Sequence, residues 1–135
     1  MQSKKQIEVV AGVIQVGNEI LCVQRPENKY TYISKKFEFP GGKIEEGETR
    51  KQALRRELNE ELDIDIDIGD FFCSIVHEYP DFKLTMHCFM CELDKKNITL
   101  NEHIDAKWLP PKLLNNLDWA EADIPIVEKL IRNEK

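Results

Sequence analysis

The stretch from residue 41 to residue 64, GGKIEEGETRKQALRRELNEELDI, constrains the fold more than any other part of this chain. Thr49 is followed three residues later by Gln52, a spacing typical of a capping box, and this predicts a helix over residues 49–62. An apolar stripe at four-residue spacing runs along one side of that helix: Leu54, Leu58 and Leu62. Because such a stripe packs against a core, it determines the direction in which the other faces of the helix point.

A second face of the same helix is acidic. Glu57, Glu60 and Glu61 stand at positions i, i+3 and i+4, so their carboxylates share one face. Like charges at this spacing destabilise a helix by about 0.2–0.5 kcal/mol per pair, a cost that folding does not require. Carboxylates on a rigid support are ligands for Mg²⁺ or Mn²⁺, and Arg56 can orient one of them through a charge-assisted hydrogen bond. The alternative interpretation is the solvated face of an ordinary Glu/Lys/Arg-rich helix.

A glycine turn precedes the helix. The sequence Pro40-Gly41-Gly42-Lys43 allows the backbone to turn sharply and approach a ligand closely, so that a carbonyl oxygen of the turn can join a metal site. Lys43 and, earlier in the chain, Arg25 are positive groups that can meet phosphates. The glycine turn, the capping box and the glutamate spacing agree with one another, and this agreement favours a metal site over a solvated face.

The rest of the chain predicts strands on both sides of this helix and a second helix near the end. Apolar and β-branched runs predict strands at residues 7–15, 19–24, 36–39, 64–68, 71–79, 84–93 and 105–109. Gly17-Asn18 provides a hairpin turn between the first two strands. Residues at helical spacing predict a final amphipathic helix: Ile124, Val127, Leu130 and Ile131. This order predicts one α+β domain over residues 1–135, a mixed β-sheet with helices packed over it.

Composition narrows the partners and the compartment. The chain has 135 residues and a formal net charge of −6, which argues against a broad attraction to duplex nucleic acid. No apolar run approaches the roughly 20 residues that span a bilayer, and the N-terminus lacks a signal-peptide cleavage pattern. Cys88 and Cys91 are spaced like a metal-binding pair, but in a strand these positions face opposite ways. We therefore expect buried thiols, a reducing compartment and a cytoplasmic location.

The motif around the first helix resembles the Nudix box, G-x5-E-x7-R-E-U-x-E-E-x-G-U, in which U is a bulky aliphatic residue. The matching positions are Gly42, Glu48, Arg56, Glu57, Leu58, Glu60, Glu61 and Ile64. Asp63 stands where the motif has its last glycine, at the helix C-terminus, and Asp tolerates the left-handed conformation often needed there. KFEFPGGK before the box and AEADIPIVEKLI near the end extend the resemblance over nearly the whole chain, closest to the MutT-like branch of the family. The resemblance implies an α/β/α sandwich and a Mg²⁺-dependent hydrolase, with Mn²⁺ as the alternative ion, that releases a nucleoside monophosphate and pyrophosphate.

The resemblance also implies roles for individual residues. The metal ligands would be the Gly41 carbonyl and the side chains of Glu57, Glu60, Glu61 and Glu102. Glu57 or Glu102 would accept a proton from the attacking water, and Glu57 is favoured because Arg56 can orient it. Glu60 and Arg56 complete the catalytic set. The phosphate contacts would be Arg25 and Lys43. Without the resemblance, Glu102 is an ordinary surface loop residue.

Base recognition is assigned to Asp123 and Tyr79. Asp123 stands where relatives that prefer oxidised guanine carry an asparagine. An ionised carboxylate only accepts hydrogen bonds, so it suits the amino group of cytosine and repels guanine O6. Tyr79 and Phe82 flank a turn from which they could stack on a base. The alternative for Asp123 is a cap of the last helix, with Pro125 in its first turn.

Together these features predict hydrolysis of a cytosine or a modified or oxidised nucleoside triphosphate. We expect a monomer or weak homodimer that binds neither membranes nor duplex nucleic acid. One alternative is a hydrolase of another nucleoside diphosphate derivative, such as a nucleotide sugar, ADP-ribose or a dinucleoside polyphosphate. The other is a catalytically silent domain that senses nucleotides, although the presence of every box carboxylate argues against lost chemistry.

Overall fold

A computed structural model describes residues 4–133 of the chain. At its centre is a mixed sheet with the strand order β3 (Phe37–Glu38), β2 (Glu19–Gln24), β1 (Lys5–Val16), β6 (Phe82–Glu92) and β5 (Phe71–Glu78). In addition, β4 (Gly41–Lys43) pairs with β1, and β7 (Asp105–Leu109) pairs with β2. β1 and β6 run parallel, whereas the other strand pairings are antiparallel.

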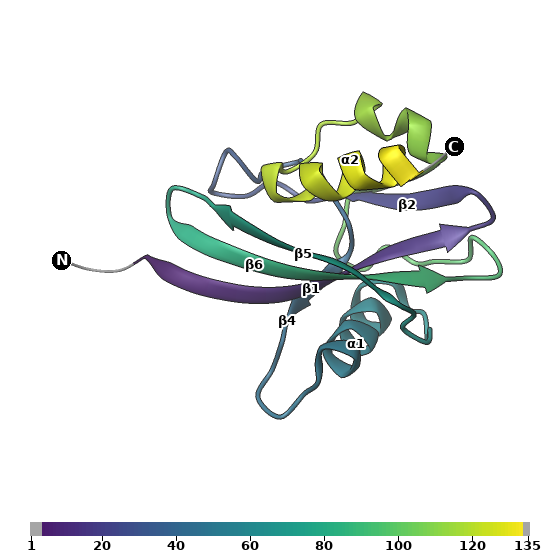
Figure 1. Ribbon diagram of the computed structural model, residues 1–135, viewed down its shortest axis with the longest axis horizontal. Coiled ribbons are helices and arrows are strands. Elements are labelled where there is room, and N and C mark those ends of the chain that lie inside the picture. Colours follow the sequence, from purple (N-terminus) through teal and green to yellow (C-terminus); the bar gives the residue numbers. More distant parts are fainter. Residues whose placement is uncertain (1–3, 134–135) are drawn as a thin grey trace.

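Helices cover both faces of this sheet (Figure 1). α1 (Arg50–Leu62) lies on one face, and α2 (Ile124–Asn133) lies on the other. Two 3₁₀ turns, η1 (Pro111–Asn116) and η2 (Glu121–Asp123), lead into α2. The predicted α+β architecture, a mixed sheet between helices, is confirmed. Within residues 4–133, every helix is too short or too polar to cross a membrane.

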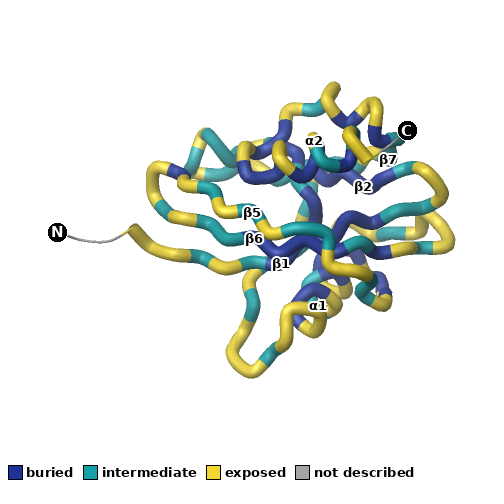
Figure 2. The backbone as a smooth tube through the Cα atoms, in the orientation of Figure 1, coloured by how far each residue is buried: buried dark blue, intermediate teal, exposed yellow. Residues whose placement is uncertain are grey.

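The core has two halves, one on each face of the sheet. Val10 and Ile14 of β1 pack with α1, whereas Ala11 and Val13 of the same strand belong to the half that α2 covers. Because residues 10–14 of β1 are buried on both faces, this part of the strand is a continuous apolar run instead of an alternating one. Figure 2 shows the middle of this strand in dark blue between the two helical layers, whereas its N-terminal part is exposed or half-buried.

The prediction that Cys88 and Cys91 face opposite ways is confirmed. Cys88 lies in the half of the core beneath α2, and Cys91 lies in the half beside α1. Both thiols are buried and free.

The strand predicted at residues 64–68 is wrong. This segment forms neither helix nor strand, although Ile64 and Ile66 are buried beside α1. Alternating burial requires only that one side of an extended segment faces the core, whereas a strand also requires a paired neighbour. Pairing with β6 begins later, where the Gly69 N–H donates to the Met90 carbonyl at 2.9 Å. The other predicted strands and both helices are confirmed, with ends shifted by at most two residues. The short strand β4 at the glycine turn was not predicted.

Candidate active site

α1 begins and ends as its sequence predicts. The Thr49 side chain accepts a hydrogen bond from the Gln52 N–H at 3.1 Å, and the Gln52 side chain accepts one from the Thr49 N–H at 2.9 Å. The leucine stripe has no exposed surface: Leu54, Leu58 and Leu62. Asp63 takes the left-handed conformation at the C-cap, with φ of 59°. The helix is therefore held at both ends and along one side, which fixes the direction of its acidic face.

The three glutamates of this face lie at different depths. The Glu60 side chain is 53% exposed, Glu57 is partly buried, and Glu61 is buried. The Glu57 carboxylate lies against the glycine turn, since a Cβ added at Gly42 would come within 2.4 Å of its Cδ atom. A Cβ at Gly41 would meet the backbone of β1 at 1.9 Å. Both glycines are thus required by the close approach of the turn to its neighbours.

Arg56 connects the helix to the loop before it. Its Nε and Nη2 atoms donate to the Glu48 carboxylate at 2.6 and 3.0 Å, and Nη2 also donates to the Lys43 carbonyl at 3.0 Å. Its Nη1 atom donates to Glu57 at 3.1 Å and to Glu60 at 3.2 Å. The hydrogen bond between Arg56 and Glu48 raises the pKa of the guanidinium and lowers the pKa of the carboxyl. Arg56 therefore orients two carboxylates of the acidic face.

Glu61 is the buried carboxylate of this site, and its hydrogen bonding is incomplete. It is 4% exposed, and its Oε1 atom has no hydrogen-bond partner among the residues that the structure describes. Burial, together with the nearby charges of Glu38, Glu57 and Glu102, raises the pKa of Glu61 to about 10. A buried carboxylate oxygen beside other carboxylates is costly unless a proton or a cation joins it.

The loop that carries Glu102 is fastened to the C-terminal end of α1. The Asn101 N–H donates to the Glu61 carbonyl at 3.0 Å, and the Asn101 side-chain amide donates to the Glu60 carbonyl at 3.0 Å. These hydrogen bonds bring the next residue, Glu102, close enough for its charge to act on Glu61. The structure therefore places Glu102 directly after a residue that is hydrogen-bonded to the backbone of both Glu60 and Glu61.

Two further residues at the site were missed from the sequence. Glu38 accepts a hydrogen bond from Arg25 Nη1 at 3.1 Å, and its other carboxylate oxygen lies 3.0 Å from His103 Nε2. The same His103 nitrogen lies 4.0 Å from Glu61. The available signals were weak: Glu38 lies two residues before Pro40 of the glycine turn, and His103 follows Glu102. In the sequence alone, neither residue can be distinguished from an ordinary surface residue. Their role becomes visible only in the folded chain, where the loop lies beside β3.

The acidic residues fit a divalent cation by their chemistry. Within residues 4–133, no three His, Cys, Asp or Glu side chains already converge as a cation site, and the Glu60 carboxylate points to Arg56. The donor set nevertheless consists of hard oxygens, one of them buried and unpaired on Glu61, which is what Mg²⁺ and Mn²⁺ prefer. Because Glu60 is exposed, it can turn from Arg56 toward an ion without disturbing the core.

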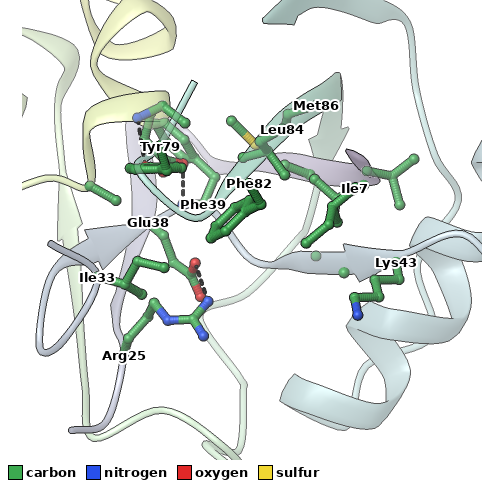
Figure 3. Close-up of a pocket in the computed structure, with 18 residues that line it drawn as sticks. Ile7, Arg25, Ile33, Glu38, Phe39, Lys43, Tyr79, Phe82, Leu84 and Met86 are labelled. Atoms are coloured by element: carbon green, nitrogen blue, oxygen red, sulfur yellow. Dashed lines mark hydrogen bonds and ion pairs between the residues drawn. The ribbon is translucent and has the colours of Figure 1, made fainter. Parts of the chain in front are cut away.

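A cavity of about 220 Å³ adjoins this acidic face. Gly41, Gly42 and Lys43 line it toward α1, while the ion pair of Arg25 with Glu38 lines another side (Figure 3). Apolar side chains of β1 and β6 form much of the remaining wall. A cavity of roughly 150 Å³ is enough to hold benzene, so this one has room for an aromatic heterocycle.

Asp123 lines the cavity from the opposite helical layer. It is 5% exposed, and its Oδ1 atom accepts a hydrogen bond from the Phe39 N–H at 3.1 Å. The carboxyl group thus ties the segment before α2 to the region of β3. Burial raises the pKa of Asp123 well above its ordinary value, and the charge of Glu38 adds to this effect.

Tyr79 also lines the cavity, but it is not a surface aromatic residue. Its side chain is buried, and its ring stacks on Tyr32 with ring centroids 5.1 Å apart. Its hydroxyl oxygen accepts a hydrogen bond from the Ala122 N–H at 3.0 Å. Tyr79 therefore anchors the residue next to Asp123.

The fold and the site define a class of protein: a sheet between helices, with a carboxylate-bearing helix beside a cavity for a ring. Residues 5–130 match the family model described as the NUDIX domain, and the chain belongs to the Nudix hydrolase family. Enzymes of this family generally use a divalent metal ion.

Similar proteins place the chain near the MutT-like members of the family. It is 35% identical over 124 residues to the CTP pyrophosphohydrolase of Escherichia coli (strain K12), covering 92% of this chain and 90% of that protein. It is 33% identical over 129 residues to the 8-oxo-dGTP diphosphatase of the same organism, covering 95% and 98%. The crystal structure of the MutT protein from Methanosarcina mazei Go1 superimposes with a TM-score of 0.86 at 26% identity, covering 100% of both chains.

Proposed function

We propose that this chain hydrolyses a nucleoside triphosphate to a nucleoside monophosphate and pyrophosphate with Mg²⁺, and that a cytosine or a modified or oxidised base fills its cavity. One adjacency carries the proposal: Gly42 lines the cavity and also lies against the Glu57 carboxylate. A base in the cavity would direct its phosphates past the glycine turn toward the acidic face of α1. The names of the two curated relatives support this class of substrate.

The acidic residues would bind the cation and move a proton. The ligands would be the Gly41 carbonyl with Glu57, Glu60, Glu61 and Glu102. When bound, Mg²⁺ supplies charge that neutralises the phosphate oxygens and makes an attacking water more acidic. Arg56 holds Glu57 by a 3.1 Å hydrogen bond, and Glu57 accepts the proton of that water, with Glu102 as the alternative base. Arg25 and Lys43, both at the cavity, contact the phosphate oxygens.

Asp123 would select the base. In its ionised form the carboxylate accepts a hydrogen bond from the amino group of cytosine. The raised pKa favours a second candidate, because a neutral carboxyl group carries an O–H donor for a carbonyl such as that of oxidised guanine. The two candidates thus correspond to two protonation states of one side chain.

Steady-state kinetics with CTP, dCTP, 5-methyl-dCTP, 8-oxo-dGTP and dATP in Mg²⁺ test the proposal. If Asp123 reads the base as a carboxylate, a cytosine nucleotide should have the highest kcat/KM, and Asp123→Asn should shift the preference toward 8-oxo-dGTP by about tenfold or more, the size of one lost base contact. If it reads the base as a neutral carboxyl group, 8-oxo-dGTP should have the highest kcat/KM in the wild type. Asp67→Asn is the matched control, because that side chain is 97% exposed.

The products separate the proposal from its alternatives. Release of anything other than a nucleoside monophosphate and pyrophosphate contradicts it and favours another nucleoside diphosphate derivative as substrate. Tight nucleotide binding with no turnover of any substrate favours the silent sensor domain.

A further inference from the structure

Two cysteines lie side by side on neighbouring strands, on the face of the sheet that α2 covers and opposite the acidic helix. Cys73 of β5 is the direct cross-strand partner of Cys88 of β6. In antiparallel pairs the Cα atoms of such partners lie about 4.5–5.5 Å apart, within the roughly 4.4–6.8 Å that a disulfide spans. Directly opposed residues point to the same face, and both side chains pack in the half of the core beneath α2.

A β-bulge creates this pairing. On one side of the bulge Phe71 is opposite Phe89, and on the other side Cys73 is opposite Cys88, so β5 contains one additional residue between them. In an unbroken register Cys73 would lie opposite His87, and its side chain would point to the other face from Cys88. The juxtaposition of the thiols is therefore a property of the folded sheet.

The two thiols differ in access and in their electrostatic environment. Cys88 has no exposed surface, whereas Cys73 is partly exposed on β5, which ends the strand order of the sheet. Lys129 of α2 lies close to Cys73, because its Nζ atom donates a hydrogen bond to the carbonyl of the preceding residue, Phe72, at 2.9 Å. The neighbouring Cys88 thiol and the Lys129 ammonium lower the pKa of the Cys73 thiol, which increases its thiolate fraction near neutral pH.

The other two cysteines lack this environment. Cys22 and Cys91 are buried, and burial raises the pKa of these thiols to about 12 and about 11. Cys91 lies on the same strand as Cys88, but on the opposite face of the sheet. Both should stay reduced under conditions in which an accessible thiolate reacts.

We propose that Cys73 and Cys88 form a peroxide-reactive dithiol, in which Cys73 reacts first and Cys88 closes a disulfide between β5 and β6. The Cys73 thiolate attacks one oxygen of hydrogen peroxide, the O–O bond breaks, and the departing hydroxide takes up a proton and leaves as water. The Cys88 sulfur then attacks the sulfur of the resulting sulfenic acid. The S–O bond breaks, and the hydroxyl group leaves as water with the proton of Cys88. In total the two thiols lose two electrons, and one peroxide becomes two waters.

Titration of the full chain with hydrogen peroxide tests this proposal, with intact mass measurement and non-reducing peptide mapping as the readouts. We expect the protein to lose the mass of two hydrogen atoms, two of its four thiols to stop reacting with a thiol reagent, and the cross-linked peptide to join Cys73 to Cys88. Cys73→Ser should abolish the cross-link, and the control Cys91→Ala should retain it. Cys88→Ala should leave a sulfenic acid at Cys73 that dimedone traps.

Several outcomes overturn the proposal: retention of all four thiols at peroxide doses that oxidise a glutathione standard, a bridge that maps to another pair, a bridge between two chains, or an unaltered cross-link in Cys73→Ser. Circular dichroism of each variant before oxidation shows whether it is folded. If Cys88→Ala does not fold, the wild-type map together with Cys73→Ser still decides.

Discussion

Among single residues, the uneven partnering of the glutamates is the most informative property of the site. Arg56 donates hydrogen bonds to Glu48, Glu57 and Glu60, yet one buried oxygen of Glu61 has no hydrogen-bond partner within residues 4–133. The guanidinium therefore neutralises the outer part of the acidic cluster and leaves the inner part without a cation. This asymmetry is expected of a metal site and not of a solvated helix face, where every carboxylate would reach water.

Glu60→Gln tests the proposed ligand set. We expect kcat/KM to fall by more than about a hundredfold, as when an essential catalytic group is lost, and the thermal stabilisation by Mg²⁺ to decrease, because ligand binding stabilises only the folded state. The fold should persist, since the side chain is 53% exposed. Hydrolysis rates and melting curves with and without Mg²⁺ measure both effects, with the exposed Glu128→Gln as control. Unchanged activity in Glu60→Gln would refute the assignment.

Tyr79→Phe distinguishes two roles of this side chain: holding the Ala122 backbone by a hydrogen bond and stacking on a base. The substitution keeps the ring but removes the hydroxyl that accepts from the Ala122 N–H. A buried donor without its partner costs about 1–3 kcal/mol, so the free energy of unfolding should fall by about that amount. Discrimination between CTP and 8-oxo-dGTP should weaken, because the neighbouring Asp123 loses its anchor. If Tyr79 acts only by stacking on a base, urea unfolding and the ratio of kcat/KM values will both match the wild type.

Among the secondary-structure elements, helices followed from local sequence more closely than strands did. α1 begins at a capping box formed within four residues of the chain, whereas the alternating segment 64–68 has strand-like burial without strand pairing. The difference is physical: a helix closes its hydrogen bonds within itself, while a strand depends on a distant partner. The same dependence explains why the bulge in β5, and with it the partner of Cys73, could not be inferred from the sequence.

Thr49→Ala tests the local origin of α1. Loss of the side-chain hydrogen bond to the Gln52 N–H should lower the free energy of unfolding by about 1 kcal/mol, the usual cost of losing such a cap. Urea denaturation measures the change. Lys51→Ala provides the comparison, because Lys51 is an exposed residue of the same helix. Equal stability of the two variants would mean that the cap contributes nothing to the start of α1.

In the whole molecule, the site exists because separate layers meet. The cavity is lined by Asp123 from the α2 layer, by Glu38 of β3, by Arg25 directly after β2, and by the glycine turn before α1. Assembly of these layers also buries a carboxyl group, Asp123, whose charge would otherwise be solvated. The burial that places Asp123 at the cavity therefore also makes the free energy of unfolding depend on pH.

The free energy of unfolding should fall as the pH rises above about 3.8, the ordinary pKa of Asp123. Below that value the carboxyl group is protonated in both the folded and the unfolded chain. Above it the unfolded chain ionises first, since the folded-state pKa is raised, so unfolding releases a proton and is favoured by higher pH. The contribution is fully lost once the pH exceeds the folded-state pKa. Asp123→Asn should remove this contribution in urea denaturation over a pH series; parallel curves for the two proteins would contradict the prediction.

The sequence by itself determined the limits of α1, the direction of its acidic face, the mixed sheet with helices and the resemblance to the Nudix family. These follow from capping, apolar spacing and a motif, all of which act within one element or its immediate flanks. Only the tertiary structure decided that Asn101 fastens the Glu102 loop to α1, that Glu38 joins Arg25 to His103, and that Asp123 is buried at the cavity. Each of these contacts joins residues far apart in the chain, where strand register and loop placement are settled by competition among distant partners.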